Sequence, residues 1–402
     1  MNICMVLNGI DFPPDIRVEK EARALISAGH RIFLLCSRTE NRPARSSWNG
    51  MEIIRIAPLR CFPIRKLNAF IYVLTLRDLQ WKKAIHKLLR THRIDAFHVH
   101  DLAMVGTVLA FARRRGIPVI ADLHENYPAL ARSAFARRKP RLAERFMWPN
   151  RWERLERRWG RRCAHVLVVV DEMKERVVAK GIRPEKITVI ENTVDVDQFL
   201  SLPVDDRLVE RFRGDFVISY IGSFAPHRGL DVVVRAMPRL LRDIPNARLL
   251  LVGDGEMMPQ LRSLAETMAL DDRVLLTGWV TFEKVPSYIA ASDVCIVPHI
   301  STEQTEASGP HKLFQYMLMA KPVVVSSCRS LRRMIEETGA GAVFKAGDSN
   351  SFAETVLKLR DPATRKTLGE AGRKAASEKY NWDKTSERLL RLYELLSDGV
   401  RP

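Results

Sequence analysis

The 402-residue sequence has no apolar run near the roughly 20 residues needed to cross a bilayer. Its N-terminus also lacks the basic start and long apolar middle of a signal peptide, so we expect a cytoplasmic protein. The six cysteines are scattered, without the paired spacing of metal ligands, and most lie in apolar runs. They are therefore predicted to be reduced and mostly buried thiols.

Acidic residues are too few to balance the basic ones. The chain has 65 Lys and Arg against 47 Asp and Glu, a formal charge of +18. This excess implies an anionic partner, which could be nucleic acid, a membrane surface or an acidic substrate. Composition alone does not choose among these three.

Apolar runs of strand length alternate with segments of helical period along the chain. Val18, Ala22, Leu25 and Ile26, for example, share one face of a predicted helix. Such alternation predicts mostly parallel sheets covered by helices. It is interrupted near residues 201–215 and then restarts, which predicts two α/β domains. The predicted bounds are 1–196 for the first domain, 197–215 for a linker, 216–378 for the second domain and 379–402 for a C-terminal helix that packs back toward the first domain.

Glycine-containing turns follow two predicted strands of the second domain. The first of these strands ends at Gly222, and His227, Arg228 and Gly229 stand at the start of the next helix. Ligands bind beyond the carboxyl ends of parallel strands, and such turns present N–H groups to phosphate. The predicted phosphate-binding residues of the two turns are Gly222, His227, Arg228, Gly229, Gly253, Asp254 and Gly255.

A third candidate loop begins at Ser308 and leads into a helix. Its first turn carries His311 and Lys312, although the positive end of the helix dipole favours acidic residues there. A phosphate in front of the helix would explain the pattern. Pro310 is predicted at the first helical position, after Ser308 or Gly309 as the N-cap. The predicted anion pocket comprises Ser308, Gly309, Pro310, His311, Lys312 and Leu313.

The order of these segments resembles that of the family-four retaining glycosyltransferases. "GSFAPHRGLDVVVRA", "LLLVGDG" and "PHKLFQYMLMAKPVVVSS" carry the resemblance in the second half, and "HVHDLA" and "PVIADLHENYP" carry it in the first. It covers nearly the whole chain. It implies a GT-B fold, with two Rossmann-like domains facing each other across a cleft. It also implies transfer of a sugar from a nucleotide diphosphate sugar, the donor, to a glycan or lipid-linked acceptor.

The resemblance assigns roles in the second domain. Arg228 and Lys312, with the helix amides, would hold the diphosphate and stabilise its charge as it leaves. The donor base would lie near Trp279, although this residue could equally serve packing. No cofactor beyond the donor is implied. The acidic run Asp195–Asp197 lies in a family segment that needs no metal, so we predict no divalent requirement.

Three residues depart from the family pattern. Ser223 stands where a second basic residue is usual, and Gln315 stands where a glutamate usually binds the donor ribose. Ala307 replaces a further glutamate, so that either Glu306 or backbone amides would make the donor-sugar contacts. A glutamine amide still hydrogen-bonds a hydroxyl, but without charge assistance.

In the first domain, the resemblance places an active-site histidine at His124, directly after a predicted strand. A histidine there could hydrogen-bond a sugar hydroxyl or stabilise developing charge. Asp15 could contact the acceptor or simply cap a helix. The acceptor-side candidates are Asp15, Arg17, Asp101, Asp122 and Glu125.

Part of the positive charge lies in a tryptophan-bearing run, residues 132–162. Basic amphipathic helices with tryptophan bind anionic bilayers. We expect the part from Trp152 to Trp159 to pack inward, and residues 132–148 to face an anionic membrane on the inner face of the plasma membrane. Residues 61–74 form a second basic and hydrophobic segment. A membrane contact of this kind would deliver a lipid-linked acceptor to the first domain.

Three alternatives remain at this point. Another GT-B enzyme, an epimerase or hydrolase, would turn over the nucleotide sugar without an acceptor. A non-enzymatic nucleic-acid binder would bind oligonucleotides in a salt-sensitive manner, but the sequence lacks a recognisable module of that kind, so we predict no nucleic-acid partner. A degenerate transferase would follow if Ser223, Ala307 and Gln315 abolish activity.

Overall fold

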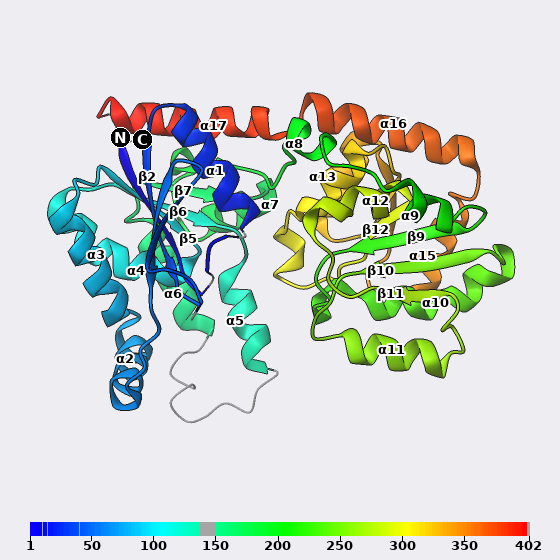
Figure 1. Ribbon diagram of the computed structural model, residues 1–402, viewed down its shortest axis with the longest axis horizontal. Coiled ribbons are helices and arrows are strands. Elements are labelled where there is room, and N and C mark those ends of the chain that lie inside the picture. The colour runs from blue at the N-terminus through cyan, green and yellow to red at the C-terminus, as the bar shows by residue number, and fades with distance from the viewer. Residues whose placement is uncertain (10, 14, 40, 137–148, 400–402) are drawn as a thin grey trace. The chain divides into compact units, whose positions relative to one another are not determined.

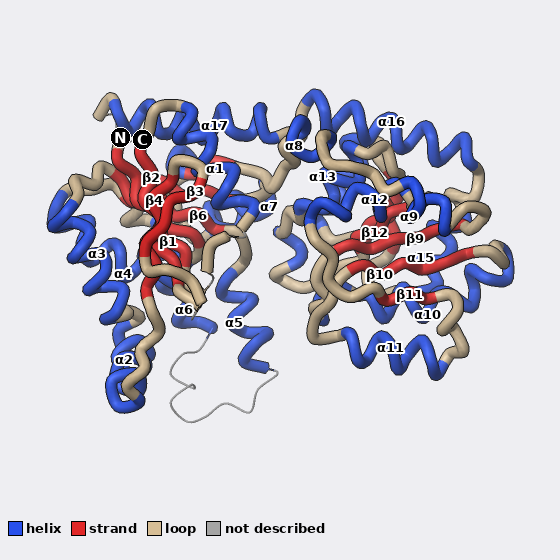
Figure 2. Tube along the Cα trace, in the orientation of Figure 1, coloured by secondary structure: helices blue, strands red, loops and turns tan. Residues whose placement is uncertain are grey.

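The computed structural model describes residues 1–9, 11–13, 15–39, 41–136 and 149–399. The chain forms two compact units, one of Met1–Glu191 with Ser386–Pro402 and one of Asn192–Thr385 (Figure 1). Each unit is built on one largely parallel sheet covered by helices (Figure 2). The α/β class of the fold, with two Rossmann-like sheets, is therefore confirmed.

The first unit contains an eight-stranded sheet of order β3-β4-β2-β1-β5-β6-β7-β8, parallel except for the antiparallel pair β3 and β4. Its central strands are continuous apolar runs buried on both faces, as parallel strands covered by helices must be. The strands are β1 (Asn2–Leu7), β2 (Arg31–Ser37), β3 (Arg45–Trp48), β4 (Met51–Ile56), β5 (Ala96–His100), β6 (Val119–Leu123), β7 (His165–Val168) and β8 (Ile187–Val189).

Helices connect these strands. The helices are α1 (Ile16–Ser27), α2 (Phe62–Thr75), α3 (Leu79–Thr91), α4 (Leu102–Ala112) with the 3₁₀ turn η1 (Arg113–Arg115), α5 (Tyr127–Ala136), α6 (Pro149–Gly160), α7 (Asp171–Ala179) and the 3₁₀ turn η3 (Pro184–Lys186).

The second unit contains a six-stranded, fully parallel sheet of order β11-β10-β9-β12-β13-β14. Its strands are β9 (Phe216–Ile221), β10 (Ala247–Val252), β11 (Val274–Leu276), β12 (Val294–Val297), β13 (Val323–Ser326) and β14 (Gly341–Phe344). Its helices and 3₁₀ turns are α8 (Val196–Leu200), α9 (Asp206–Arg211), η4 (Pro226–Arg228), α10 (Leu230–Asp243), α11 (Met258–Thr267), η5 (Phe282–Lys284), α12 (Val285–Ala290), η6 (Thr305–Ala307), α13 (His311–Leu318), α14 (Arg329–Thr338), α15 (Ser349–Leu357), α16 (Pro362–Glu378) and, reaching into the first unit, α17 (Trp382–Ser397).

The strand order of each sheet reverses at its centre. The chain proceeds outward from β1 to β2 and then returns to β5 on the other side, and it does the same at β9 and β12. Ligands of open parallel sheets bind beyond the strand ends at such points. The loops that follow β9 and β12, and those that follow β5 and β6, are therefore the places to search for a site.

The unit boundaries differ from the predicted ones. The first division falls after Glu191 rather than after residue 196, and the second falls after Thr385 rather than after residue 378. Residues 197–215, predicted as a linker, belong to the second unit because they dock on it. The Asp205 backbone N–H donates to Ser287 Oγ of α12 at 2.9 Å, and Phe212 is buried.

The C-terminal helix α17 enters the core of the first unit. Its Tyr393 is fully buried, and the hydroxyl group lies 2.8 Å from Nδ1 of His98 on β5. Five of the six free cysteines are buried, and Cys61 is exposed. Among the described residues, no helix is both long and apolar enough to span a membrane.

Candidate functional site

Lys312 lies in the first turn of α13, and its ammonium group is buried. The Nζ atom lies 3.5 Å from the centroid of the Tyr220 ring at the end of β9. It has no hydrogen-bond acceptor among the residues that the structure describes. Burial and the charge of Arg228 hold the pKa of Lys312 well below its usual value. A buried cation without an acceptor is costly, and an incoming anion would remove that cost.

Arg228 ends the 3₁₀ turn η4, which follows β9. Its Nη1 donates to Nε2 of His299 at 2.8 Å, and its buried Nε has no partner in the described part of the chain. His299 is completely buried after β12. Burial and the charges of Arg228 and Lys312 keep the pKa of His299 well below its usual value, so that the neutral ring accepts this bond. His299 thus orients the Arg228 side chain, and the Nε–H group of Arg228 remains available to a ligand.

The predicted glycines allow this close packing. A Cβ at Gly222 would lie 2.5 Å from Lys312 Nζ, and one at Gly253 would lie 2.0 Å from the carbonyl oxygen of Gly222. A Cβ at Gly255 would come within 2.8 Å of the Phe224 backbone. All three glycines have positive φ, which side chains disfavour. The two turns therefore pack directly on each other beside Lys312.

The prediction for the start of α13 was wrong by one residue. The helix begins at His311, and Pro310 is its N-cap with extended backbone rather than its first residue. The N-cap residue Pro310 makes no side-chain capping bond. The Gly309 carbonyl accepts a hydrogen bond from Asn192 Nδ2 at 2.9 Å, and Ser308 Oγ donates to the Thr305 carbonyl at 3.3 Å. A helix start whose N-cap offers no side-chain acceptor suits an anion pocket.

Three other residues predicted to contact the donor lie on loops and helices of the second unit. Glu306 accepts from Ser301 Oγ at 2.5 Å and from the Arg329 N–H at 2.8 Å, so both carboxylate oxygens are engaged at the start of α14. Trp279 is 66% exposed, so most of its surface is accessible to a ligand and only a minor part is used in packing. Gln315 is half-buried on α13.

The remaining predicted donor residues lie in the same loops. Ser223 and His227 are half-buried in the turn after β9, and the Ser223 carbonyl accepts from the Tyr220 hydroxyl at 2.8 Å. Asp254 accepts the Gly255 N–H on its side chain and the Phe224 N–H on its carbonyl. Gly229 caps α10 with φ of 66°, and buried Leu313 anchors α13 in the core.

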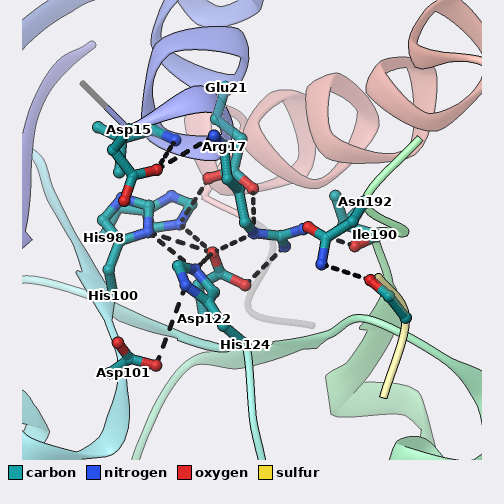
Figure 3. Close-up of polar contacts among 12 residues, drawn as sticks. Asp15, Arg17, Glu21, His98, His100, Asp101, Asp122, His124, Ile190 and Asn192 are labelled. Carbon is teal, nitrogen blue, oxygen red and sulfur yellow. Dashed lines mark hydrogen bonds and ion pairs between the residues drawn. The ribbon is translucent and has the colours of Figure 1, made fainter. Parts of the chain in front are cut away.

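In the first unit, Arg17 and Asp122 form a buried fork. Arg17 Nε and Nη2 donate to the two oxygens of Asp122 at 2.9 and 2.7 Å, and Nη1 donates to the Ile190 carbonyl at 2.8 Å (Figure 3). Both side chains are buried. Both residues were predicted to contact the acceptor. Because their charged groups pair with each other instead, we infer that they hold neighbouring side chains in place. The guanidinium of Arg17 holds the pKa of Asp122 well below its usual range despite burial.

Three further buried side chains adjoin this fork. Glu21 lies one helical turn after Arg17, with Oε1 3.1 Å from Arg17 Nε and Oε2 3.2 Å from His98 Nε2. His100 Nδ1 lies 3.2 Å from Asp122 Oδ2. Burial lowers the pKa of His100 to about 3, and burial raises the pKa of Glu21.

This buried cluster has a composition that metals accept. Ligand atoms of Glu21, His98, His100 and Asp122 all lie within 4.8 Å of one another. Arg17, however, already occupies both oxygens of Asp122 with a positive charge. A divalent ion would have to displace or repel that guanidinium, so the donor set fits an internal ion-pair network better than a metal centre.

His124 is the one histidine of this group with partial exposure. Its Nε2 lies 2.6 Å from Asp122 Oδ2, and Nδ1 lies 3.9 Å from Asp101 Oδ1. Its side chain is 18% exposed. Burial alone would lower the pKa of His124, but the carboxylates of Asp122 and Asp101 outweigh burial and raise it to about 9. The ring is therefore a cation at neutral pH, with Nδ1–H available to a ligand.

The other predicted residues frame His124. Asp101, which follows β5, has φ of 64° and ψ of 156°, a conformation that residues other than glycine rarely adopt. Asp15 accepts from the Arg17 and Val18 N–H groups, so its predicted alternative as a helix cap is confirmed. Glu125 is half-buried directly after His124.

The titration of His124 gives a direct test of this arrangement. With ¹³C-labelled histidine, the His124 resonance, assigned by its loss in His124→Gln, should titrate with a midpoint near pH 9. Because the carboxylates raise this pKa, Asp101→Asn should move the midpoint downward, toward about 6.5. A wild-type midpoint at or below 6.5 would show that the carboxylates do not control the ring.

Sequence reasoning missed five residues of these two clusters. Glu21, His98, His100, Tyr220 and His299 were not singled out. Some signals were present, since His98 and His100 are two apart on a strand and share a face, and Glu21 is four residues after Arg17 on a helix. Nothing local to the sequence marks Tyr220 or His299.

Family models match segments of both units. Residues 16–198 match the Glycosyltransferase Family 4 model, and residues 215–361 match the model of Glycosyl transferases group 1. The UDP-Gal:alpha-D-GlcNAc-diphosphoundecaprenol alpha-1,3-galactosyltransferase of Escherichia coli is 22% identical over 329 residues, 79% of this chain and 80% of that protein.

Two solved structures resemble the whole chain. Sucrose-phosphate synthase of Thermosynechococcus elongatus has a TM-score of 0.79 at 18% identity and covers 99% of this chain and 100% of its own. HepE of Anabaena, in complex with UDP-glucose, has a TM-score of 0.73 at 15% identity and covers 97% of this chain and 99% of its own.

The two sheets and these matches define the class, which is that of the GT-B glycosyltransferases. The chain itself belongs to the glycosyltransferases that join a Family 4 domain to a group 1 domain, and it is a transferase enzyme.

Proposed function

We propose that the protein is a retaining, metal-independent glycosyltransferase that uses a nucleotide diphosphate sugar. Its acceptor would be a glycan or a lipid-linked molecule in the synthesis of a surface polysaccharide or glycolipid. One observation carries the proposal: Lys312 Nζ and Arg228 Nε are buried in the second unit without partners among the described residues. A diphosphate is the chemical group that this pair of cations best accommodates.

The surroundings of the two cations support this choice of donor. The glycine turns after β9 and β10 leave no room for side chains beside Lys312, and α13 begins in the same region after an N-cap proline that offers no side-chain acceptor. Trp279, exposed after β11, is available for stacking on the base. The complex of HepE with UDP-glucose makes a uridine nucleotide a reasonable first donor to test.

The proposed reaction requires little covalent help from the protein. The bond from the sugar C1 to the diphosphate oxygen breaks, and its electron pair leaves with the diphosphate. The acceptor hydroxyl forms the new bond to C1 on the same face, and its proton passes to a leaving phosphate oxygen. Lys312, Arg228 and the start of α13 would stabilise the negative charge that develops. No step requires a metal ion.

His124 would serve on the acceptor side of this reaction. Its protonated ring keeps one N–H on the side of Asp101, and a sugar hydroxyl is the natural acceptor of that hydrogen bond. Asp101 and Glu125 would border the acceptor, whereas Arg17 and Asp122 would hold His124 in place.

The nature of the acceptor follows from charge and from a relative. The galactosyltransferase of Escherichia coli acts, by its name, on a sugar diphosphoundecaprenol. A charge of +18 suits an acceptor of that kind at an anionic membrane. We therefore place the protein in the cytoplasm, on the inner face of the plasma membrane, without a nucleic-acid partner.

The stereochemistry of the product tests the reaction class. A panel of UDP-, GDP-, ADP- and TDP-sugars would first be screened for thermal stabilisation. With the stabilising donor and an acceptor, proton NMR should show that the product keeps the anomeric configuration of the donor, with turnover unchanged by EDTA. Inversion would contradict the retaining mechanism, and equal turnover without an acceptor would indicate an epimerase or hydrolase.

His124→Ala separates the acceptor role from donor binding. This variant should impair transfer by about 10²-fold while the thermal stabilisation by the nucleotide stays unchanged, since the donor cations lie in the other unit. Equal loss of nucleotide binding would contradict the assigned role.

A further inference from the structure

One helical layer of the first unit carries cations that its own carboxylates do not balance. In this layer α2 packs against α3, α3 against α4, and α4 against α6 (Figure 1). Residues 61–94 include eight Lys and Arg residues but a single acidic residue, Asp78. Asp78 is already used as the N-cap of α3. Apart from Arg93, which pairs with Asp95 at 3.0 Å, the segment that holds α2 and α3 therefore presents mostly uncompensated positive charge.

A groove of about 470 Å³ runs between α4, η1 and α6, and we call it the arginine groove. Trp159 lines it, and the Trp159 ring packs so closely on α4 that a Cβ at Gly106 would lie 2.2 Å from it. Leu109 and Leu155 also line the groove. The charged residues that line the groove are Arg77, Arg113, Arg114, Arg158 and Arg162.

The five arginines line one groove, and no carboxylate of the described residues pairs with them. Arginines elsewhere in the same unit do form such pairs. Glu156 of α6 is buried and bound instead by Arg176 and Lys180. Desolvation and the like charges of Arg158 and Arg113 lower the pKa of Arg162. Such mutual repulsion is relieved when an anion occupies the space between the charges.

The neighbouring helix α2 exposes large apolar side chains. Phe62, Ile64, Leu67 and Phe70 are 54, 52, 54 and 58% exposed, and they make up four of the nine large hydrophobic residues exposed on the described chain. Lys66 Nζ lies 4.5 Å from the centroid of the Phe62 ring. Apolar side chains interleaved with cations on one helix are typical of helices that lie in a membrane interface.

A second basic groove continues the surface from α4 onto α3. This groove, of about 770 Å³, lies between α3 and Phe111 of α4. Its cations are Lys82, Lys83, Lys87 and Arg90, and Lys82 Nζ lies 5.9 Å from the Phe111 ring. Because Phe111 lines one groove and the preceding Ala110 lines the other, the two are adjacent on the surface.

We propose that the arginine groove binds the headgroup phosphate of an anionic phospholipid while α2 inserts its apolar side chains into the same bilayer. This inference rests on the proposed membrane association and assigns it a place in the structure. The sequence analysis put the membrane contact at 132–148, a prediction that the structure does not test, and named 61–74, which includes α2, as a second basic and hydrophobic segment. Residues 137–148, with Trp148, lie outside the described residues. Trp152 and Trp159, predicted to pack inward, are buried.

A bilayer fits this surface better than the other anionic partners. Nucleic acid would meet the cations but would gain nothing from the exposed aliphatic side chains Ile64 and Leu67 on α2. Free phosphate would fill the arginine groove but would leave α2 uncovered. An anionic membrane satisfies the charges and the apolar side chains together.

The test uses the full chain in sedimentation with vesicles. Binding is expected to vesicles of phosphatidylcholine with 30% phosphatidylglycerol, and to be at least tenfold weaker to phosphatidylcholine alone. Each cation near an anionic surface strengthens binding about fivefold, so Arg158→Gln/Arg162→Gln should weaken it on the order of 25-fold. A matched control, Arg235→Gln/Arg262→Gln, removes two exposed arginines from the second unit and should change binding less than threefold.

The apolar contribution has its own variant. Leu67→Ser/Phe70→Ser should weaken binding at least tenfold, because these side chains are already exposed and their loss costs little in folding. Vesicle binding that is equal in all variants and the control would overturn the proposal. So would binding that is lost only in the arginine variant while inorganic phosphate competes fully, since a soluble anion would then explain the groove.

Two further measurements separate this proposal from others. Equally tight, salt-sensitive binding of a duplex oligonucleotide, lost in the same arginine variant, would assign the surface to nucleic acid instead. Thermal stabilisation by a nucleoside diphosphate reports only on the second unit and should be unchanged in every variant. If that stabilisation holds while vesicles are not bound, the membrane proposal fails and the proposed donor site stands.

Discussion

Replacement of Lys312 by methionine is expected to lower kcat by about 10²-fold or more. Lys312 Nζ is buried beside Gly222 and Tyr220, where a departing diphosphate would develop its charge. The measurement is the turnover of nucleotide sugar under saturating donor and acceptor. Lys358→Ala removes an exposed lysine from the same unit and should leave kcat unchanged.

The same substitution should not destabilise the free protein. In the absence of an anion, the buried Nζ has no acceptor among the described residues, and such a group costs about 1–3 kcal/mol or more. Methionine fills similar space without that cost, so the free energy of unfolding should stay equal or rise. A large loss of both stability and kcat would instead mean that Lys312 supports the fold.

The uptake of protons when a nucleoside diphosphate binds is an independent test of the role proposed for Lys312. Burial and Arg228 hold the pKa of Lys312 well below its usual value in the free protein, and a bound diphosphate would raise it again. Calorimetry of nucleoside diphosphate binding in buffers of different ionisation enthalpy should therefore show a net gain of protons. The gain should be absent in Lys312→Met, and the same gain in this variant would place its origin elsewhere.

Asp122→Asn is expected to lower the free energy of unfolding by about 3–5 kcal/mol. The substitution keeps the shape of the side chain but removes a carboxylate charge that both Arg17 and His124 contact at hydrogen-bond distance. The buried guanidinium of Arg17 would then rely on Glu21, 3.1 Å away, whose pKa burial raises, and removing one charge from a buried ion pair is strongly unfavourable. Urea unfolding followed by circular dichroism measures the change.

A compensating pair distinguishes lost charge from lost packing. In Arg17→Met/Asp122→Leu neither charge is left alone, so much of the stability should return. Glu185→Gln, in the exposed pair with Arg183, serves as the control and should cost less than about 1 kcal/mol. If Asp122→Asn cost no more than this control, Arg17 would not depend on Asp122.

Most of the fold was accessible from the sequence because the signals are local. Parallel strands buried on both faces read as continuous apolar runs, and helices read by their period of 3.6 residues. The antiparallel edge strand β3 (Arg45–Trp48) was not predicted, because it is half-exposed and polar and so does not form a continuous apolar run. The predicted unit boundaries also differ from those of the structure, because α9 packs on α12 through contacts that no local sequence pattern indicates.

The candidate donor site was predicted in part for a similar reason. Gly222, Gly253 and Gly255 indicate tight turns after strands. Lys312 places a positive charge at the positive end of a helix dipole. Both features are visible in a single sequence. The residues that contact the two cations of this site were not predicted from the sequence. His299 is 71 residues from Arg228, and Tyr220 is 92 residues from Lys312 along the chain.

By itself, the sequence determined the alternation of strands and helices, the glycine turns at the strand ends and the excess of positive charge. Only the tertiary structure decided which charges are paired. It paired Arg17 with Asp122 in a buried fork and exposed the apolar side chains of α2. Among the described residues, it left Lys312 Nζ without an acceptor and five arginines of the first unit without a carboxylate partner. The physical reason is that the electrostatic state of a side chain depends on burial and on neighbours distant in sequence, which a local pattern does not contain.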